Sequence, residues 1–134
     1  MNEPIRVVIA DDNAQFRQGI VSTLASEPDM VVVGQGATGD DAVVLSRDLS
    51  PDIVLLDLNM PGGGLLAAAI IAAIRPKTKI VILTGSDIDE YMQTAQRIGA
   101  RGYLLKGISA RELVRALHAV TGGASYWPPS VSYS

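Results

Sequence analysis

Short apolar runs and longer amphipathic segments alternate along the whole chain. The runs at residues 6–10, 30–33, 53–56, 79–83 and 102–105 are continuous and largely apolar, and all but the last contain β-branched residues, which is typical of strands buried on both faces. The segments at 14–25, 40–49, 65–75, 87–98 and 110–121 carry apolar side chains at helical spacing. This strict alternation predicts an α/β domain with a parallel five-stranded sheet and helices on both faces.

Residues that begin and end helices support these boundaries. Asn13 and Ser109 precede predicted helices and are preferred N-cap residues. Pro51 and Pro76 follow two of the predicted helices, and Gly99 follows another. The residues from 124 onward differ, because they are rich in Pro, Ser and aromatic residues and carry no charge. We therefore interpret this tail as a linker or a frayed end.

Composition narrows the class of protein. The chain has 134 residues, of which 48% are hydrophobic, enough for one domain with a core. Its net charge of −3 argues against a nucleic-acid module. The absence of cysteine excludes a disulfide scaffold and a thiol nucleophile and fits a reducing compartment. The longest apolar run, 65–74, is shorter than the about 20 residues that span a membrane, and the start does not resemble a signal peptide. We expect a cytoplasmic protein.

Polar side chains with potential chemistry follow the predicted strands. Ligands of open α/β sheets bind beyond the carboxyl ends of the strands, so these residues are the first candidates for a site. In chain order they are Asp11, Asp12, Asp57, Thr84, Gly85 and Lys106.

Three carboxylates in one pocket repel one another, by roughly 4 kcal/mol for a pair about 4 Å apart at an effective dielectric constant near 20. Lys106 alone does not neutralise three acids, whereas Mg²⁺, which prefers carboxylate and carbonyl oxygens, does. A magnesium ion beside an ammonium, a hydroxyl and a loop amide suits a phosphoryl group. A carboxylate can itself accept that group and form an aspartyl phosphate.

At this constellation the sequence resembles the receiver domain of bacterial two-component response regulators. The matching motifs lie at 9–12, 56–62, 83–85 and 102–106, and the resemblance covers about residues 4–122. The segment 123–129 resembles the linker that leads to a helix-turn-helix DNA-binding domain in the NarL/FixJ (LuxR-type) subfamily. The resemblance therefore implies a receiver domain at 1–122 and a linker at 123–134 toward an absent DNA-binding domain.

The same resemblance implies a doubly wound, flavodoxin-like (βα)5 fold with strand order 2-1-3-4-5. Its implied function is a switch that a sensor histidine kinase phosphorylates, and that then changes self-association or output-domain contacts to regulate transcription. As a catalyst it would act only on itself, in its own phosphorylation and dephosphorylation. It would not bind membranes. DNA would be bound only through the absent domain.

The resemblance also implies roles for single residues. Asp57 would accept the phosphoryl group, and Asp12, Asp57 and the Asn59 carbonyl would hold Mg²⁺, with Asp11 acting directly or through water. The group of residues that would contact the phosphoryl group or report its presence is Lys106, Thr84, Asn59, Gly85 and Tyr103, with Thr84 and Tyr103 as the switch pair.

Several alternatives remain at this point. The chain could be a stand-alone receiver, a pseudo-receiver that binds partners without phosphorylation, or a phosphatase of the haloacid dehalogenase type. That enzyme class needs a second acid two residues after its nucleophile, where this chain has Asn59. The glycines at 34–39 match the dinucleotide-binding pattern, but the first strand, where that pattern belongs, ends in two acids.

Three further features stand out. Gly107 occupies a position where the family often has proline, and the loop at 61–66 is about one residue shorter than usual. The stretch 65–74 of the third predicted helix has no polar side chain, which suggests weak self-association or contact with a missing domain. Trp127 is expected to pack on the domain as a linker aromatic.

Overall fold

The computed structural model describes residues 3–85 and 89–128, in which strands and helices alternate from end to end. The strands are β1 (Ile5–Ala10), β2 (Met30–Gly36), β3 (Ile53–Leu56), β4 (Lys79–Thr84) and β5 (Gly102–Leu105). The helices are α1 (Ala14–Ala25), α2 (Gly39–Leu49), α3 (Gly64–Ile74), α4 (Asp89–Ile98) and α5 (Ala110–Thr121).

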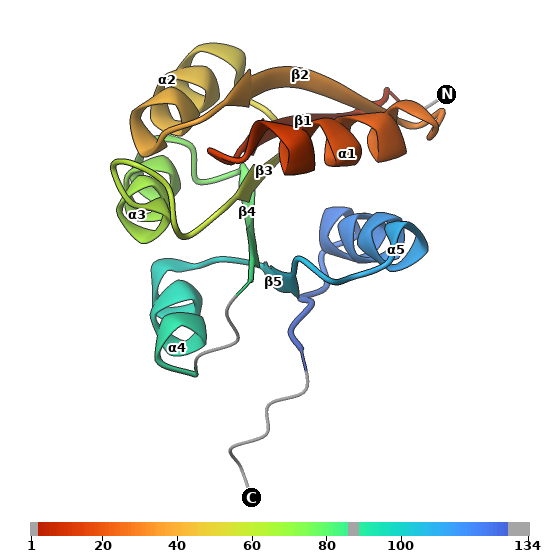
Figure 1. Cartoon of the computed structure of the whole chain (residues 1–134). Coiled ribbons are helices and arrows are strands. Elements are labelled where there is room, and N and C mark those ends of the chain that lie inside the picture. The colour runs from red at the N-terminus through yellow and green to blue at the C-terminus, as the bar shows by residue number, and fades with distance from the viewer. Residues whose placement is uncertain (1–2, 86–88, 129–134) are drawn as a thin grey trace, which may run out of the picture.

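The five strands form one parallel sheet in the order β2-β1-β3-β4-β5. This confirms the predicted fold class and the strand order that the resemblance implied. Because all strands point the same way, the residues that follow β1, β3, β4 and β5 gather at one edge of the sheet. In Figure 1 the strands can be followed in this order through the centre of the molecule.

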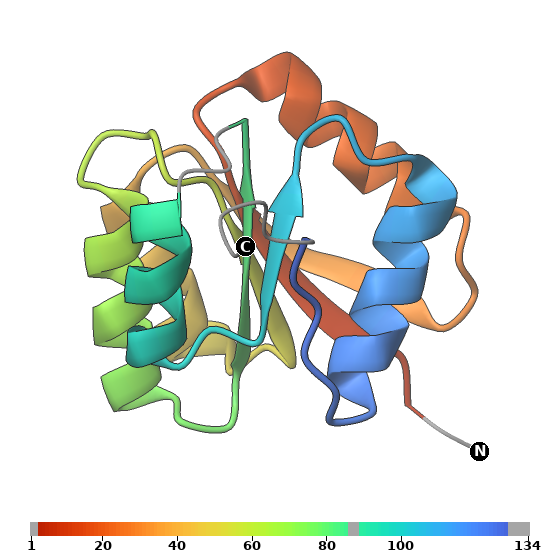
Figure 2. The same ribbon diagram turned by 90° about the horizontal axis from the view of Figure 1, so that it is seen from below.

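Two apolar cores lie on opposite faces of the sheet. Successive strand residues point to opposite sides, so Val8 and Val54 join the core under α2, α3 and α4, whereas Val7 and Ile53 join the core under α1 and α5. Figure 2 shows these two groups of helices on either side of the sheet. Burial on both faces explains why the strands are continuous apolar runs. No helix in the described ranges is long and apolar enough to cross a membrane.

The second strand is longer than its apolar run predicted. It continues from Val33 to Gly36, because after an irregularity between Val7 and Val8 the strand β1 pairs with residues 34–36. A side chain at Gly34 would press against Leu45, so small residues are used where α2 crosses close to the strand. The predicted start of the fourth helix, at residue 87, lies outside the described residues, and the described part of that helix begins at Asp89.

The end of the described chain packs on the domain. Tyr126 pairs in parallel with Gly102, and the Tyr103 N–H donates to the Tyr126 carbonyl oxygen over 2.9 Å. The ring of Trp127 stacks on Tyr103, with ring centroids 6.0 Å apart. The expected packing of Trp127 is therefore found, whereas pairing of this segment with β5 was not predicted. Residues 129–134 lie outside the described part of the chain.

Candidate functional site

Three acidic residues converge where β1 and β3 end. These strands are neighbours in the sheet, and the Asp57 N–H donates to the Ala10 carbonyl oxygen over 3.0 Å, which fixes the two strand ends side by side. Each of Asp11, Asp12 and Asp57 offers an oxygen atom within 4.8 Å of the others. Asp11 and Asp57 are buried, at 2% and 4% exposure, while Asp12 is exposed. The carboxylates that are far apart in the sequence therefore form one cluster.

Lys106 reaches this cluster from the end of β5. Its backbone N–H donates to the Thr84 carbonyl oxygen over 2.8 Å, which holds it across the end of β4. Its Nζ lies 2.8 Å from Asp11 Oδ2 and 3.5 Å from Asp57 Oδ2. The ammonium also lies 4.6 Å from the centre of the Phe16 ring, at the start of α1. Lys106 is thereby positioned between two carboxylates and an aromatic face.

The electrostatics of the cluster show an excess of negative charge. Burial, and then the charge of Asp11, raise the pKa of the Asp57 carboxyl, although Lys106 acts in the opposite direction. Burial opposes the charged form of Lys106, but its hydrogen bonds and ion pairs with Asp11 and Asp57 prevail and raise the pKa of Lys106. The lysine therefore stays charged, and the acids share more negative charge than it offsets. Such an oxygen-rich cluster suits a hard divalent cation.

The other predicted site residues lie around this cluster or behind it. Asn59 is exposed in the loop after β3, and its backbone N–H donates to the Asp57 carboxylate. Thr84 is the buried last residue of β4, and Gly85 follows it on the surface. Tyr103 is fully buried in the core on the α4 side, so it lies behind the acidic cluster rather than within it.

The loop between β3 and α3 is shaped by backbone conformations that favour glycine. Gly62 and Gly63 have φ values of +89° and +80°, in the left-handed region that side chains rarely adopt. A Cβ on Gly64 would collide with the Asp57 carbonyl oxygen. The three consecutive glycines thus let α3 begin directly against the strand end that carries Asp57.

Sequence reasoning did not identify two residues at this site. Phe16 was counted only as an apolar position of a helix, and nothing in its spacing indicated that Lys106 would lie over its ring. The Arg17 guanidinium donates to the Asp11 carbonyl oxygen and so ties α1 to the site. The available signal was the position of Phe16 and Arg17, in the first turn of the helix that follows Asp11 and Asp12.

The glycine pattern at 34–39 does not form a phosphate cradle. The Asp41 carboxylate accepts the Ala37 N–H over 2.9 Å, and this bond lowers the pKa of Asp41. An anion of the protein itself therefore occupies the backbone donor that a pyrophosphate would need. The structure gives the dinucleotide interpretation no support.

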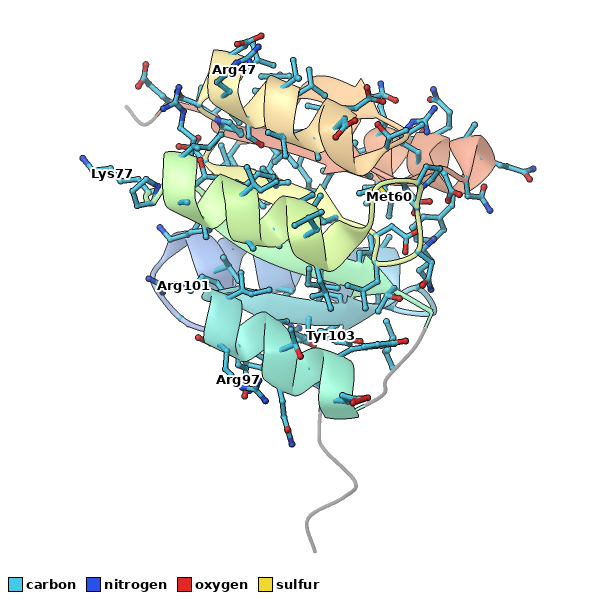
Figure 3. All side chains as sticks on the ribbon, turned by 90° about the vertical axis from the view of Figure 1, so that its left-hand side faces the viewer. Arg47, Met60, Lys77, Arg97, Arg101 and Tyr103 are labelled. Atoms are coloured by element: carbon cyan, nitrogen blue, oxygen red, sulfur yellow. The ribbon has the colours of Figure 1, made fainter. Side chains whose placement is uncertain are left out.

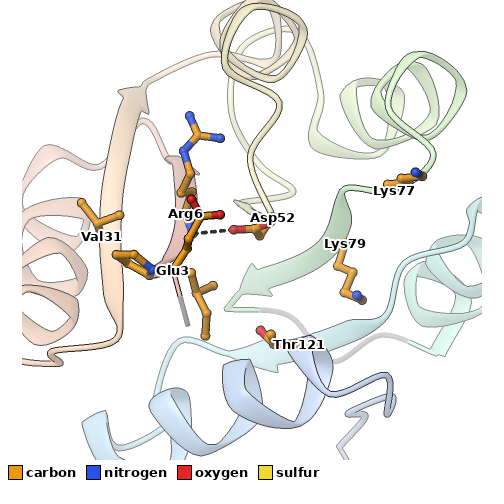
Figure 4. A pocket seen from close by; sticks show the side chains of 9 residues that line it. Glu3, Arg6, Val31, Asp52, Lys77, Lys79 and Thr121 are labelled. Carbon is orange, nitrogen blue, oxygen red and sulfur yellow. Dashed lines mark hydrogen bonds between the residues drawn. The ribbon is translucent and has the colours of Figure 1, made fainter. Parts of the chain in front are cut away.

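A separate hollow of about 640 Å³ lies at the opposite edge of the sheet (Figure 4). It is lined by residues of both charges, including Arg6, Asp52 and Lys79. The Asp52 carboxylate accepts the Arg6 N–H over 2.8 Å, and the Arg6 guanidinium donates to backbone carbonyl oxygens at the end of α2. Arg6 and Asp52 are thus engaged in contacts that hold β1 to the end of α2 and the start of β3.

Comparison with known proteins agrees with this geometry. The family model described as "Response regulator receiver domain" matches residues 7–118. Response regulator GacA of Pseudomonas aeruginosa is 37% identical over 129 residues, covering 96% of this chain and 60% of the relative. Nitrate/nitrite response regulator protein NarL of Escherichia coli is 36% identical over 124 residues, covering 90% of this chain and 56% of the relative.

Solved structures give the same result. The signal receiver domain of the putative response regulator NarL from Mycobacterium tuberculosis superposes with a TM-score of 0.87 at 33% identity, covering 91% of this chain and 99% of that one. The chain thus spans nearly all of an isolated receiver domain but little more than half the length of the curated relatives.

Proposed function

The chain belongs to the response regulator receiver domain family, in its NarL/FixJ (LuxR-type) branch, and on this premise we propose that it is a switch that is phosphorylated on Asp57. The phosphoryl group would come from the phosphohistidine of a sensor histidine kinase in the cytoplasm. The modified domain would then change its contacts with itself or with an output domain that regulates transcription.

One observation carries this proposal: the convergence of Asp11, Asp12 and Asp57 within 4.8 Å, with the Lys106 ammonium against two of them. Asp57 is buried at the end of β3, with two further acids beside it and the Lys106 ammonium 3.5 Å from its carboxylate. This arrangement suits a carboxylate that acts as a nucleophile and then carries added negative charge.

The residues present fit a magnesium ion. The acidic donor set exceeds the charge that Lys106 offsets, and all of its donors are oxygen atoms, as Mg²⁺ prefers. We assign the ion to Asp11, Asp12, Asp57 and the carbonyl oxygen of Asn59. Bound there, it would supply positive charge against the oxygens of the phosphoryl group.

Phosphotransfer would use the side chains as follows. A carboxylate oxygen of Asp57 attacks phosphorus, a new P–O bond forms, and the P–N bond to the kinase histidine breaks. Lys106 offsets the charge on the phosphoryl oxygens, while the Thr84 hydroxyl and the Gly85 N–H donate hydrogen bonds to them. Attack of water on the same phosphorus would later break the P–O bond to Asp57, restore the carboxylate and release inorganic phosphate.

The response would be reported by Thr84 and Tyr103. Thr84 ends β4 and Tyr103 lies in the adjacent strand β5, so a shift of the hydroxyl toward the phosphoryl group changes the packing at Tyr103. Tyr103 in turn stacks on Trp127 in the chain that leaves the domain. Through this contact, a change at Tyr103 would be passed to the segment that contains Trp127.

The test is incubation of the chain with a small phosphodonor, with Mg²⁺ or with a chelator, followed by intact-mass spectrometry. We expect a single added phosphoryl group that requires Mg²⁺ and that Asp57→Asn abolishes. Asp48→Asn, which removes an exposed acid paired with Arg47 far from the site, is the matched control and should be modified like the parent chain.

Two results would contradict the proposal. A chain that stays unmodified with Mg²⁺ present would act as a pseudo-receiver. Continuous release of phosphate without a stable adduct would indicate a phosphatase that uses Asp57 as its nucleophile.

A further inference from the structure

The Lys106 ammonium has an aromatic contact beside its two acidic ones. Its Nζ lies 2.8 Å from Asp11 Oδ2, 3.5 Å from Asp57 Oδ2 and 4.6 Å from the centre of the Phe16 ring. The face of an aromatic ring attracts a cation out to about 6 Å from its centre, so the third contact is within range. A residue of α1 that belongs to no carboxylate pair therefore takes part in holding this cation.

Lys106 also borders a hollow of about 420 Å³ between α1 and α5. The lining of this hollow includes the apolar side chains of Ile20 and Leu113, and none of the described residues that line it is acidic. The lysine side chain is 24% exposed, and its four-carbon stem is flexible. The Phe16 ring lines the same hollow. Its attraction for the ammonium therefore opposes movement of Lys106 away from the acids on this side.

The position of the Phe16 ring is tied to the same acid that pairs with Lys106. The Phe16 N–H donates to the side-chain oxygen of Asn13, the N-cap of α1, over 2.9 Å. The Asn13 N–H in turn donates to Asp11 Oδ1 over 2.9 Å, while Asp11 Oδ2 pairs with Lys106. The four residues thus form a closed circuit of contacts. Support of this kind presents the ammonium with a preset position.

We propose that Phe16 is a positioning residue, whose ring holds the Lys106 ammonium where it can reach a phosphoryl group on Asp57. This inference rests on the proposed phosphorylation of Asp57. The distance of 3.5 Å from Lys106 to Asp57 exceeds the about 2.8 Å of a charge-assisted hydrogen bond by about 0.7 Å. A displacement of this size leaves the ammonium within about 6 Å of the ring centre. Lys106 therefore keeps its aromatic contact while it turns from Asp11 toward the new group.

The chain contains a single phenylalanine, so the chemistry of this one ring can be changed without altering any other residue. Expression in a host that requires phenylalanine, supplied with mono-, di- or trifluorinated phenylalanine, labels Phe16 alone. Each fluorine withdraws electron density from the ring face and weakens its attraction for a cation, with little change in shape. A loss that grows with the number of fluorines therefore reports the contact with the ammonium rather than packing.

The contact itself is measured in the unphosphorylated chain, by urea unfolding in the presence of a chelator. We expect the folding equilibrium constant of the parent chain to fall stepwise, by about threefold or more with three fluorines. In Lys106→Met, which keeps a long side chain without the charge, the same fluorines should cause no such fall. Packing changes are common to both series, so their difference isolates the pair of ring and ammonium. If Lys106→Met does not fold, the stepwise fall in the parent series remains the criterion.

The consequence for the site is measured with a small phosphodonor and Mg²⁺, as the rate at which the phosphoryl adduct appears in intact-mass spectra. We expect this rate to fall in the same order, by about threefold or more with three fluorines. The matched control combines Phe16→Leu with Tyr91→Phe, so that its single phenylalanine is at position 91. Tyr91 packs against the core on the α4 side, in front of the sheet in Figure 3, whereas Phe16 packs on the opposite face. Fluorines at position 91 should leave the rate of the control unchanged.

Two results would overturn the proposal. One is a parent chain whose stability does not depend on the number of fluorines, because the ring would then serve packing alone. The other is a phosphorylation rate that stays constant or rises as fluorines are added, because the contact would then not position Lys106 for the transfer. A chain that accepts no phosphoryl group even without fluorine refutes the proposed function, and this inference with it. The unfolding series distinguishes that case, since it detects the contact without phosphorylation.

Discussion

Replacing Asp57 with asparagine should stabilise the folded chain when Mg²⁺ is withheld. The carboxylates of Asp11, Asp12 and Asp57 lie within 4.8 Å of one another. At that separation, two unit charges repel by about 3.5 kcal/mol at an effective dielectric constant near 20. Lys106, at 3.5 Å, attracts Asp57 by about 4.7 kcal/mol on the same scale. The repulsion of Asp57 by Asp11 and by Asp12 together therefore exceeds its attraction to Lys106 by roughly 2 kcal/mol.

Two further effects act on this difference. Burial of the Asp57 charge adds to the penalty, while solvent around the exposed Asp12 screens part of the repulsion. The amide keeps the shape of the side chain and removes the charge. We expect a gain of about 1–2 kcal/mol in the free energy of unfolding, which corresponds to a rise of about 3–10 °C in Tm for a chain of this size.

The dependence on pH follows from the raised pKa of Asp57. The folded chain holds this proton more tightly than the unfolded chain, so the penalty grows as pH rises from the ordinary range of an aspartate through the raised pKa. Above the raised pKa it is fully present. The advantage of Asp57→Asn should therefore be constant above the raised pKa and diminish as pH falls through it toward the ordinary range of an aspartate.

Urea unfolding monitored by circular dichroism, with a chelator present, measures this difference. Asp48→Asn removes an exposed acid from a surface ion pair and should give no gain. Added Mg²⁺ should stabilise the parent chain more than the variant, by about 1.4 kcal/mol at ten times its dissociation constant. If Asp57→Asn unfolds at the same or a lower urea concentration in chelator, the assumed surplus of negative charge is refuted.

Three further predictions concern other parts of the chain. Gly64→Ala should destabilise by about 3 kcal/mol or more, because its Cβ collides with the Asp57 carbonyl oxygen; a chain of parental stability in urea would show that the loop adapts freely. Ser109→Ala removes the oxygen that caps α5 and should lower the free energy of unfolding by about 1 kcal/mol, measured in the same way, and no change would mean that the cap contributes nothing. Beryllofluoride with Mg²⁺ should shift the fluorescence of Trp127, the single tryptophan, because it stacks on Tyr103; an unchanged spectrum on a chain shown to bind beryllofluoride would argue against this connection.

The fold and the acidic cluster were predictable because they depend on features that periodicity reports directly. Asp11 and Asp57 each end an apolar run, and parallel strands bring such ends to one edge whatever the details of packing. Lys106 follows the same rule from β5. The sequence therefore indicated which residues would meet, although not the distances between them or which acid would be buried.

The remaining features depend on tertiary contacts that no local pattern reports. The role of Gly64 depends on how closely α3 approaches a carbonyl oxygen of the preceding strand. Phe16 has the spacing of any core residue, yet its ring lies under Lys106. The pairing of Tyr126 with β5 arises from backbone groups, which the uncharged composition of the tail does not reveal.

The pairing of Tyr126 beside Gly102 also determines where this folded unit can safely be cut. A chain that stopped at residue 122, the boundary suggested by the sequence motifs, would lose the two backbone hydrogen bonds that Tyr126 makes with Arg101 and Tyr103. Arg101 and Tyr103 would then expose unpaired carbonyl and amide groups to water. The Tyr103 ring would also lose its stacking contact with Trp127. An exposed edge strand of this kind can pair with the strands of other chains and so start aggregation. We therefore expect a chain that keeps residues 123–128 to stay in solution at concentrations where one that stops at residue 122 aggregates.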